Sequence, residues 1–380
     1  MMKWKKVRLT DISKLKQWKN LPISELSTEG FPVYGANGII GRYKEYNHQF
    51  PTLAITCRGA TCGTINSTEP KSYITSNAMA LDNISEDVDQ KFLYYALNRR
   101  GFKDVITGAA QPQITREGLS KIVLDIPESK EYQLHIANLL SKAENLIAQR
   151  KESIRLLDEF LKSTFLEMFG EVSCNKKKFD KVELKYFGEI ITGNTPSRKN
   201  PDNYSSNFIE WIKTDNITSD NTYVIKAVEC LSERGLKNAR TASSGSLLVA
   251  CIAGSIESVG RAALTDRTVS FNQQINAIQP NKDVEPLYLY WLFKISKKYI
   301  QNHASKGMKK ILTKGEFEKI KMIKPPLELQ TKFARIVEKT EALKEQYKQS
   351  LQELENLYGC LSQKAFHGEM CINKKVRRKF

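Results

Sequence analysis

Two stretches of the chain carry an apolar pattern with a period of 3.5 residues. Between Ile136 and Met168, alternating steps of four and three residues fall on apolar side chains at eight of ten positions. Residues 333–365 repeat the pattern with a more polar middle. This period is typical of a coiled-coil seam rather than the broader apolar face of a globular helix. The predicted seam residues are Ile136, Leu140, Ile147, Ile154, Leu157 and Leu161 in the first helix and Phe333, Val337, Tyr347, Leu351, Leu354 and Tyr358 in the second.

These helical segments belong to a longer internal repeat. Ile114-Thr115-Arg116 recurs 198 residues later as Leu312-Thr313-Lys314, and positions as far as Gly170 find counterparts at an offset of 198 or 197. Each predicted helix follows a proline and ends near a glycine, Gly170 or Gly368, which are common start and stop signals. The chain therefore carries one structural plan twice.

The repeat predicts an architecture with approximate two-fold symmetry inside one chain. Each helix of roughly 38 residues would be about 57 Å long. Because the connection between the halves is short, we expect an antiparallel helix pair with one globular domain at each end; the alternative is that each helix packs only on its own domain. The predicted segments are a first domain (1–130), a first helix (131–170), a linker (171–180), a second domain (181–326), a second helix (327–369) and a basic tail (370–380).

Both globular halves contain short β-type runs separated by Gly, Asn and Pro, which predicts an α+β fold of two tandem mixed domains. Residues 53–57 and 247–251 are similar apolar runs, which indicates a shared frame. The loops that follow, 58–63 and 252–257, have different sequences, so the two domains are predicted to have different targets. Asn37-Gly38 predicts a tight hairpin turn.

The net charge of +17 over 380 residues is concentrated outside the predicted helices. The helices sum to −2, so the rest of the chain carries +19. This distribution is expected of a nucleic-acid binder with a structural spacer, although a basic surface can also serve solubility alone. No apolar run of membrane length and no signal peptide is visible, so a cytoplasmic protein is expected.

Polar and basic residues in the loops are candidates for contacts with DNA. Gln111 and Gln113 flank Pro112, and glutamine can bind adenine through two hydrogen bonds in the major groove. The aligned Lys309-Lys310 would contact phosphate or guanine, and the segment 194–198 suits phosphate contacts or an ordinary loop equally well. The full predicted set is Arg42, Arg58, Gln111, Gln113, Arg116, Thr195, Ser197, Arg198, Lys213, Asn216, Ser255, Lys309 and Lys310.

The chain shows no constellation of residues that predicts catalysis. Asp180 with Glu183-Leu184-Lys185 resembles a nuclease element, but the spacing is too short. Neither a phosphate-binding loop nor the motifs of a DNA methyltransferase is found, and no cofactor or metal site is predicted. The four histidines lack ligand spacing and are predicted to lie at the surface, and the seven scattered cysteines indicate neither a zinc site nor a disulfide framework.

The chain resembles the specificity subunits of Type I restriction and modification enzymes, because a domain followed by a long helix occurs twice in the same order. The resemblance covers nearly the whole chain and includes residues 34–38, 192–197, 211–213 and 272–273, together with the glutamines Gln133 and Gln330 that open the helices. Asn194 departs from the family, which often has glycine at that position, so the turn there is in question.

The resemblance implies a subunit that recognises a two-part DNA target with a nonspecific gap. Two target recognition domains would bind the half-sites, and a spacer of about 57 Å would cover on the order of 16 base pairs. The implied partners are double-stranded DNA, two modification subunits and, through them, restriction subunits. S-adenosylmethionine, ATP and Mg²⁺ are expected on those partners. The alternatives are a free-standing nuclease or methyltransferase, a coiled-coil DNA-binding scaffold, and a silent or inactive specificity variant.

Overall fold

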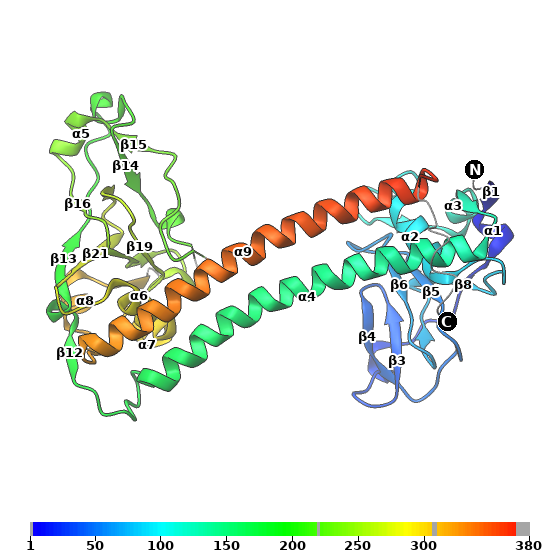
Figure 1. Ribbon diagram of the computed structural model, residues 1–380, viewed down its shortest axis with the longest axis horizontal. Helices are drawn as coiled ribbons and strands as arrows, with labels where there is room; N and C mark the ends of the chain where they lie inside the picture. Colours follow the sequence, from blue (N-terminus) through cyan, green and yellow to red (C-terminus); the bar gives the residue numbers. More distant parts are fainter. Residues whose placement is uncertain (1–2, 219–220, 306–309, 370–380) are drawn as a thin grey trace, which may run out of the picture. The chain divides into compact units, whose positions relative to one another are not determined.

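The computed structural model describes residues 3–218, 221–305 and 310–369 (Figure 1). The chain divides into two compact units. Unit 1 comprises Met1–Lys151 with Gln349–Phe380, and unit 2 comprises Glu152–Lys348. The division passes through both long helices, so each unit contains one mixed α/β domain and half of each helix.

Unit 1 begins with a domain of two main sheets. An antiparallel sheet has the order β2-β8-β5-β6, and a second sheet has the order β4-β3-β7 with β3 and β7 parallel. The elements are β1 (Trp4–Arg8), α1 (Leu9–Ile12), β2 (Lys14–Gln17), η1 (Ile23–Glu25), β3 (Phe31–Gly35), β4 (Gly38–Tyr43), β5 (Leu53–Thr56), β6 (Ile65–Ser67), β7 (Tyr73–Ile74), β8 (Ala78–Asp82), α2 (Gln90–Arg100), β9 (Ile106–Thr107), β10 (Gln113–Ile114), α3 (Arg116–Ser120) and β11 (Val123–Pro127).

Unit 2 repeats this topology with different loops. Its antiparallel sheet has the order β13-β21-β17-β19, and its second sheet, β15-β14-β20-β16, again contains one parallel pair, β14 with β20. The elements are β12 (Lys181–Glu183), η2 (Leu184–Tyr186), β13 (Gly188–Thr192), η3 (Pro201–Tyr204), β14 (Ile209–Ile212), η4 (Thr214–Asn216), β15 (Cys230–Leu231), α5 (Glu233–Lys237), β16 (Thr241–Ala242), β17 (Leu247–Ala250), β18 (Ile252–Ala253), η5 (Ile256–Ser258), β19 (Ala262–Leu264), β20 (Val269–Phe271), β21 (Ile275–Pro280), α6 (Pro286–Ile295), α7 (Lys297–Gln301), β22 (Lys310–Ile311), α8 (Lys314–Lys319) and β23 (Lys321–Ile323).

The two predicted helices are present as α4 (Lys130–Phe169) and α9 (Leu327–Phe366). Gly170 and Gly368, just beyond their ends, have φ of +72° and +74°, a conformation that favours glycine and ends a helix. Within unit 1, α4 and α9 pack antiparallel, because Glu144 contacts Tyr358 while Lys151, further along α4, contacts Glu355, earlier in α9. The same order holds in unit 2, where Asp158 contacts Lys344 and Phe165 contacts Phe333. The predicted fold class is confirmed.

A buried glutamine attaches each long helix to its own domain. Gln133, near the start of α4, is 1% exposed, donates from Nε2 to the carbonyls of Asp87 (3.1 Å) and Pro127 (2.9 Å), and accepts from the Asp89 amide (2.8 Å). Gln330 makes the equivalent three bonds at the start of α9. Its partners are Asp283, Glu285 and Pro325. These bonds fix the direction in which each helix leaves its sheet.

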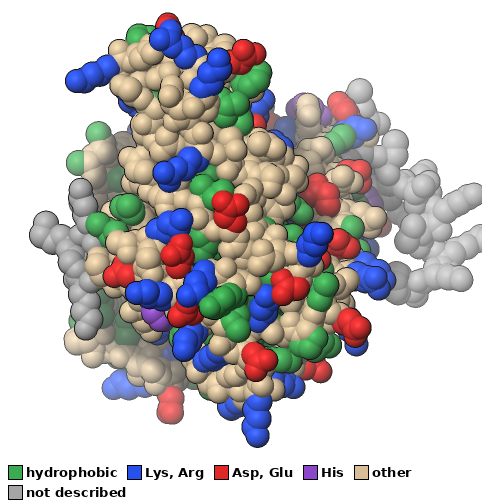
Figure 2. Space-filling model, turned by 90° about the vertical axis from the view of Figure 1, so that its left-hand side faces the viewer, with side chains coloured by type: hydrophobic (Ala, Val, Ile, Leu, Met, Phe, Trp, Pro, Cys, Tyr) green, Lys and Arg blue, Asp and Glu red, His purple; other side chains and the backbone are tan. Residues whose placement is uncertain are grey.

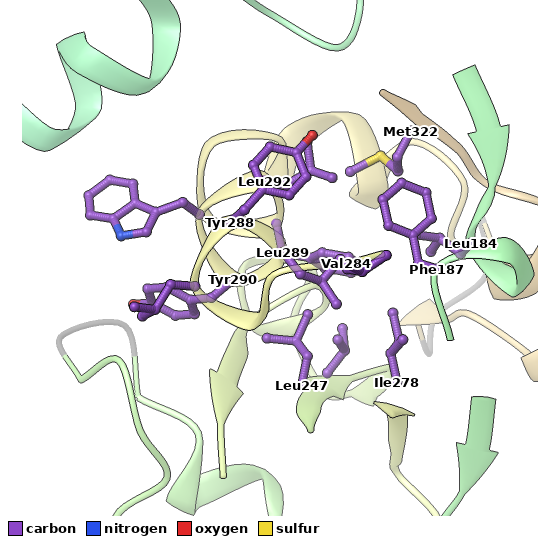
Figure 3. Packing of buried hydrophobic residues seen from close by; sticks show 14 of the residues in the cluster. Leu184, Phe187, Leu247, Ile278, Val284, Tyr288, Leu289, Tyr290, Leu292 and Met322 are labelled. Carbon is purple, nitrogen blue, oxygen red and sulfur yellow. The ribbon is translucent and has the colours of Figure 1, made fainter. Parts of the chain in front are cut away.

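The largest core of unit 2 surrounds α6. Tyr288, Leu289 and Leu292 of α6 lie among Leu247 and Ile278 of the sheet and Phe187 beside η2 (Figure 3). Phe165, Phe169 and Phe333 of the long helices join the same cluster, and each buried aromatic side chain contributes about 1.5–3 kcal/mol. In unit 1 the equivalent core joins α2 to Ile136 and Leu140 of α4. The helix halves are therefore part of the two cores.

Candidate nucleic-acid interface

Four loops of unit 1 meet where strands of both sheets end. We call this region loop edge 1 and define it by residues 36–37, 57–63, 75–77 and 111–113. Backbone bonds hold the loops together: Thr75 N donates to Tyr34 O (2.9 Å), Cys57 N to Asn77 O (2.9 Å), and Gly59 N to Pro112 O (3.1 Å). Thr61 Oγ1 donates to the carbonyl at position 36, which attaches the Asn37-Gly38 hairpin to the same region.

Unit 2 has the same arrangement, which we call loop edge 2 (residues 194–198, 213–216, 252–258, 272–274 and 310–311). Asn272 N donates to Ile212 O (3.0 Å), and Cys251 N donates to Gln274 O (2.8 Å). These bonds are the counterparts, in the internal repeat, of the first two bonds of loop edge 1. The frame is thus repeated at the level of single hydrogen bonds, while the side chains that it presents differ.

Of the candidates in unit 1, the structure brings together Arg58, Gln111 and Gln113. Arg58 and Gln113 face each other in an antiparallel bridge, and all three residues are exposed. Arg42 instead donates to Gly30 O (2.8 Å), near the far end of β4 from the hairpin turn. Arg116 lines a pocket with residues that include Lys14, at the opposite end of β2 from loop edge 1.

In unit 2, the candidates Thr195, Ser197, Arg198, Lys213, Asn216 and Ser255 all belong to loop edge 2. Thr195 Oγ1 contacts Gln273 Oε1, and Asn216 Oδ1 accepts from the Lys213 amide (2.9 Å). Ser197 is exposed, and Ser255 Oγ lies 3.2 Å from Ser258 Oγ. Asn194, which stands where the family often has glycine, does not adopt a positive φ. Its side chain donates a hydrogen bond to Asn238 O and accepts one from the Arg240 amide.

The remaining candidates are Lys309 and Lys310, of which Lys310 is the first residue of β22. Lys310 pairs through its backbone with Ala253, next to the Ile252–Ile311 pair, which corresponds to Arg58 and Gln113 in unit 1. Lys309 lies outside the described residues. The strand pairing brings this segment to loop edge 2.

Sequence reasoning missed Glu229, which holds two of the candidate cations. Its Oε1 lies 2.7 Å from Nη2 of Arg198, and its Oε2 accepts from Lys213 Nζ. Burial raises the pKa of the Glu229 carboxyl, but the hydrogen bonds from Lys213 and Arg198 outweigh burial and hold the pKa below its ordinary value. Glu229 is 31 positions from Arg198, and no local pattern signals this contact.

Side chains of the predicted seam are all removed from solvent at least in part. Five of the twelve are buried and seven are partly buried. The polar middle of α9 contains Lys344, which is 8% exposed and bonds Asp158 (2.5 Å) on α4. In unit 1 a different polar contact joins the helices: Glu144 of α4 accepts from Tyr95 of α2 (2.6 Å) and from Tyr358 of α9 (3.0 Å).

The prediction that the histidines lie at the surface is wrong for His48. This side chain is 9% exposed, and its two ring nitrogens contact Asp82 Oδ1 (2.9 Å) and Asn47 Oδ1 (2.6 Å). Trp18 packs edge-on against the ring and donates to Asp82 Oδ2 (3.2 Å). Because a buried imidazole needs partners for both nitrogens, this cluster satisfies the ring within the domain.

On the face of unit 2 that Figure 2 shows, no patch of one charge marks a binding surface. On the end of unit 2 shown in Figure 2, Lys and Arg side chains are interspersed with Asp and Glu. The interface is therefore better defined by the converging loops than by a patch of one sign.

Among the described residues, none of the helices is long and apolar enough to cross a membrane.

The fold and its two loop edges define a protein with two tandem recognition domains. A family model described as the Type I restriction modification DNA specificity domain matches residues 1–156 and, a second time, residues 176–356. The chain belongs to this family.

Two relatives that match parts of this chain are specificity subunits of Type I restriction enzymes. The specificity subunit of the Type I restriction enzyme HindI from Haemophilus influenzae is 31% identical over 166 residues, 41% of this chain and 35% of the relative. The EcoprrI specificity subunit from Escherichia coli is 28% identical over 116 residues, 30% of this chain and 28% of the relative. The aligned part thus spans about a third of the length of these relatives.

The fold is similar to that of a Type I restriction-modification S subunit from M. genitalium, with a TM-score of 0.63, 17% identity and 96% of each chain covered. A chain from a structure of the type I R-M system, solved to explain its complex assembly and conformational transition, has a TM-score of 0.57 and 17% identity, with 97% of this chain and 98% of that chain covered. At this level of identity, the two likenesses support the fold.

Proposed function

We propose that this chain is the DNA sequence-recognition subunit of a Type I restriction and modification complex. Loop edge 1 would bind one half of a two-part target, and loop edge 2 would bind the other half, with a nonspecific gap between the halves. The chain would recognise DNA in the cytoplasm without catalysing a reaction. S-adenosylmethionine, ATP and Mg²⁺ would bind to the modification and restriction subunits.

The observation that carries this proposal is one frame with two different loop surfaces. The backbone bonds of the loop edges are repeated, so both surfaces are presented in the same way. Arg58 and Gln113 lie side by side on loop edge 1, whereas Ile252 and Ile311 occupy the equivalent positions in unit 2. Since base readout depends on side-chain type, the two edges are expected to select different bases.

The long helices provide a repeated surface for partner subunits. Leu146 on α4 and Leu357 on α9 are 50% and 49% exposed in unit 1. Their counterparts at an offset of 197 are Leu343 on α9 and Phe160 on α4, which are 37% and 51% exposed in unit 2. Exposed apolar residues that recur in both units are suited to two copies of one partner, and we propose that each unit docks one modification subunit.

An exchange of residues 181–326 for the second domain of another member of the family tests recognition. The methylation motif would be determined by sequencing the methylome of a host that expresses the chain with its cognate modification subunit. We expect a split motif for the native chain and a change in one half-site only for the exchanged chain. A change in both halves, or no split motif from an assembled complex, would contradict the proposal and favour a scaffold or an inactive variant.

Partner docking is tested by the stoichiometry of the complex in native mass spectrometry. Leu146→Lys or Leu343→Lys alone should reduce the number of bound modification subunits from two to one, and the double variant should bind none. Leu156→Lys is the matched control, because Leu156 is 49% exposed but its counterpart in the repeat is Glu353. An unchanged stoichiometry in the double variant would exclude this surface.

A further inference from the structure

We propose that Arg198 reads a guanine of the target and that Glu229 is the positioning residue that orients it. This inference rests on the function proposed above and assigns a base and two residues to loop edge 2. Its basis is a cluster of five side chains: Arg198, Lys213, Glu229, Tyr204 and Trp211. Contacts join these side chains. Trp211 belongs to β14 and Glu229 directly precedes β15; both strands are labelled in Figure 1.

The aromatic rings hold the Arg198 guanidinium in one place. Its carbon lies 5.0 Å from the centre of the Tyr204 ring and 5.4 Å from that of Trp211, within the range of a cation–π contact. The same two side chains also form hydrogen bonds with the loop that carries Arg198. Tyr204 OH donates to Pro196 O (2.8 Å), and Trp211 Nε1 donates to Asn194 O (3.2 Å). The loop and its side chain are therefore fixed by the same two residues.

Glu229 completes the orientation of Arg198. One carboxylate oxygen of Glu229 lies 2.7 Å from Nη2 of Arg198, and the other accepts a hydrogen bond from Lys213 Nζ. A guanidinium has five N–H donors, so one bond to Glu229 leaves donors for a ligand. The Arg198 side chain is still 58% exposed, whereas that of Glu229 is 28% exposed. The carboxylate thus supports the arginine from within, and the arginine faces outward.

Such preorganisation favours a base over a phosphate as the ligand. A phosphate accepts hydrogen bonds from many directions and can be bound by a flexible cation as a point charge. Guanine presents N7 and O6 on one edge, and a planar guanidinium binds both only when its orientation is fixed. A fixed arginine loses little conformational entropy on binding, which increases discrimination between bases.

The test measures the affinity of the assembled complex for its own motif and for oligonucleotides with each base pair of the second half-site substituted in turn. The motif itself comes from the methylome of the native chain. For Arg198→Lys, which keeps the charge, we expect the preference for G·C at one position to fall by about tenfold or more, with other positions unchanged. For Glu229→Gln, we expect the same position to lose at least about fivefold of its preference, while nonspecific affinity stays equal or rises.

Matched controls come from a second arginine–carboxylate pair, whose carboxylate, Glu210, lies on β14. Arg267 contacts Glu210 through Nε (3.0 Å) and Nη2 (2.7 Å), and neighbouring strand residues such as Glu210 and Trp211 point to opposite faces of the sheet. Arg267→Lys and Glu210→Gln should leave every base preference unchanged. Circular dichroism and complex assembly would verify that all variants fold.

Three results would overturn the inference. A uniform loss of affinity for Arg198→Lys at all positions would identify a phosphate contact. Unchanged binding would make the cluster a structural ion pair. Equal effects in Glu210→Gln and Glu229→Gln would exclude a positioning role for Glu229. Failure of the native complex to show a split motif would instead reject the proposed function, so the two failures are distinguishable.

Discussion

Removal of the buried glutamine at the start of α4 should destabilise unit 1 selectively. Gln133→Ala deletes three hydrogen bonds and leaves the Asp89 amide and the carbonyls of Asp87 and Pro127 without this partner. Each bond contributes about 1 kcal/mol, and a buried group left unpaired costs about 1–3 kcal/mol. We therefore expect a loss of about 3–4 kcal/mol, which is large compared with the stability of a domain.

Hydrogen exchange is the suitable assay for Gln133→Ala, because a chain with two compact units need not unfold in a single transition. A loss of about 3 kcal/mol should accelerate the slowest amides of unit 1 by about a hundredfold while those of unit 2 keep their rates. Gln330→Ala should produce the reverse pattern. Gln352→Ala, an exposed glutamine on α9, should change neither unit. An acceleration below about tenfold, or an equal one in both units, would refute the reasoning.

Three further predictions concern unit 2 and the cysteines. In urea unfolding, Asp158→Asn should lower the free energy of unfolding by about 1–3 kcal/mol, because it leaves buried Lys344 without its main counter-charge. Lys344→Met should change the free energy of unfolding by less than about 1 kcal/mol. In native alkylation at pH 8, followed by mass spectrometry, exposed Cys360 should react while Cys251 stays protected, since burial raises the pKa of the Cys251 thiol to about 12. The depressed pKa of Glu229 means that its stabilising contribution is complete above the ordinary value of 4.5 and is lost as the pH falls through the lower folded value. Urea midpoints between pH 6 and pH 3 should therefore fall less in Glu229→Gln than in the native chain.

Much of the fold could be predicted from the sequence because its signals are local and periodic. The seam period marked both long helices to within a few residues of α4 and α9, and the glycines marked their ends. The Asn37-Gly38 pair marked the β3–β4 hairpin, although the turn itself consists of residues 36–37 with Gly38 opposite Gly35. The offset of 197 or 198 residues revealed the shared frame before any strand order was known.

The tertiary structure decided which side chains lie together. Arg42, Arg58 and Arg116 are all basic in the sequence, but of these three only Arg58 reaches loop edge 1. Arg42 lies near the far end of β4, and Arg116 begins α3 and lines a pocket with Lys14. His48 is buried because β8 brings Asp82 to its ring.

Loop edge 2 shows the same limit. Its composition follows from the pairing of β14 with β20 and of β18 with β22. The Arg198–Glu229 contact depends on the pairing of β14 with β15, which holds the Glu229 carbonyl against the Trp211 amide. Helix and turn signals depend on neighbours within a few residues, whereas these contacts depend on strand pairing across tens of residues. The sequence by itself therefore determined the repeated frame of this protein, and the tertiary structure determined the surfaces that the frame presents.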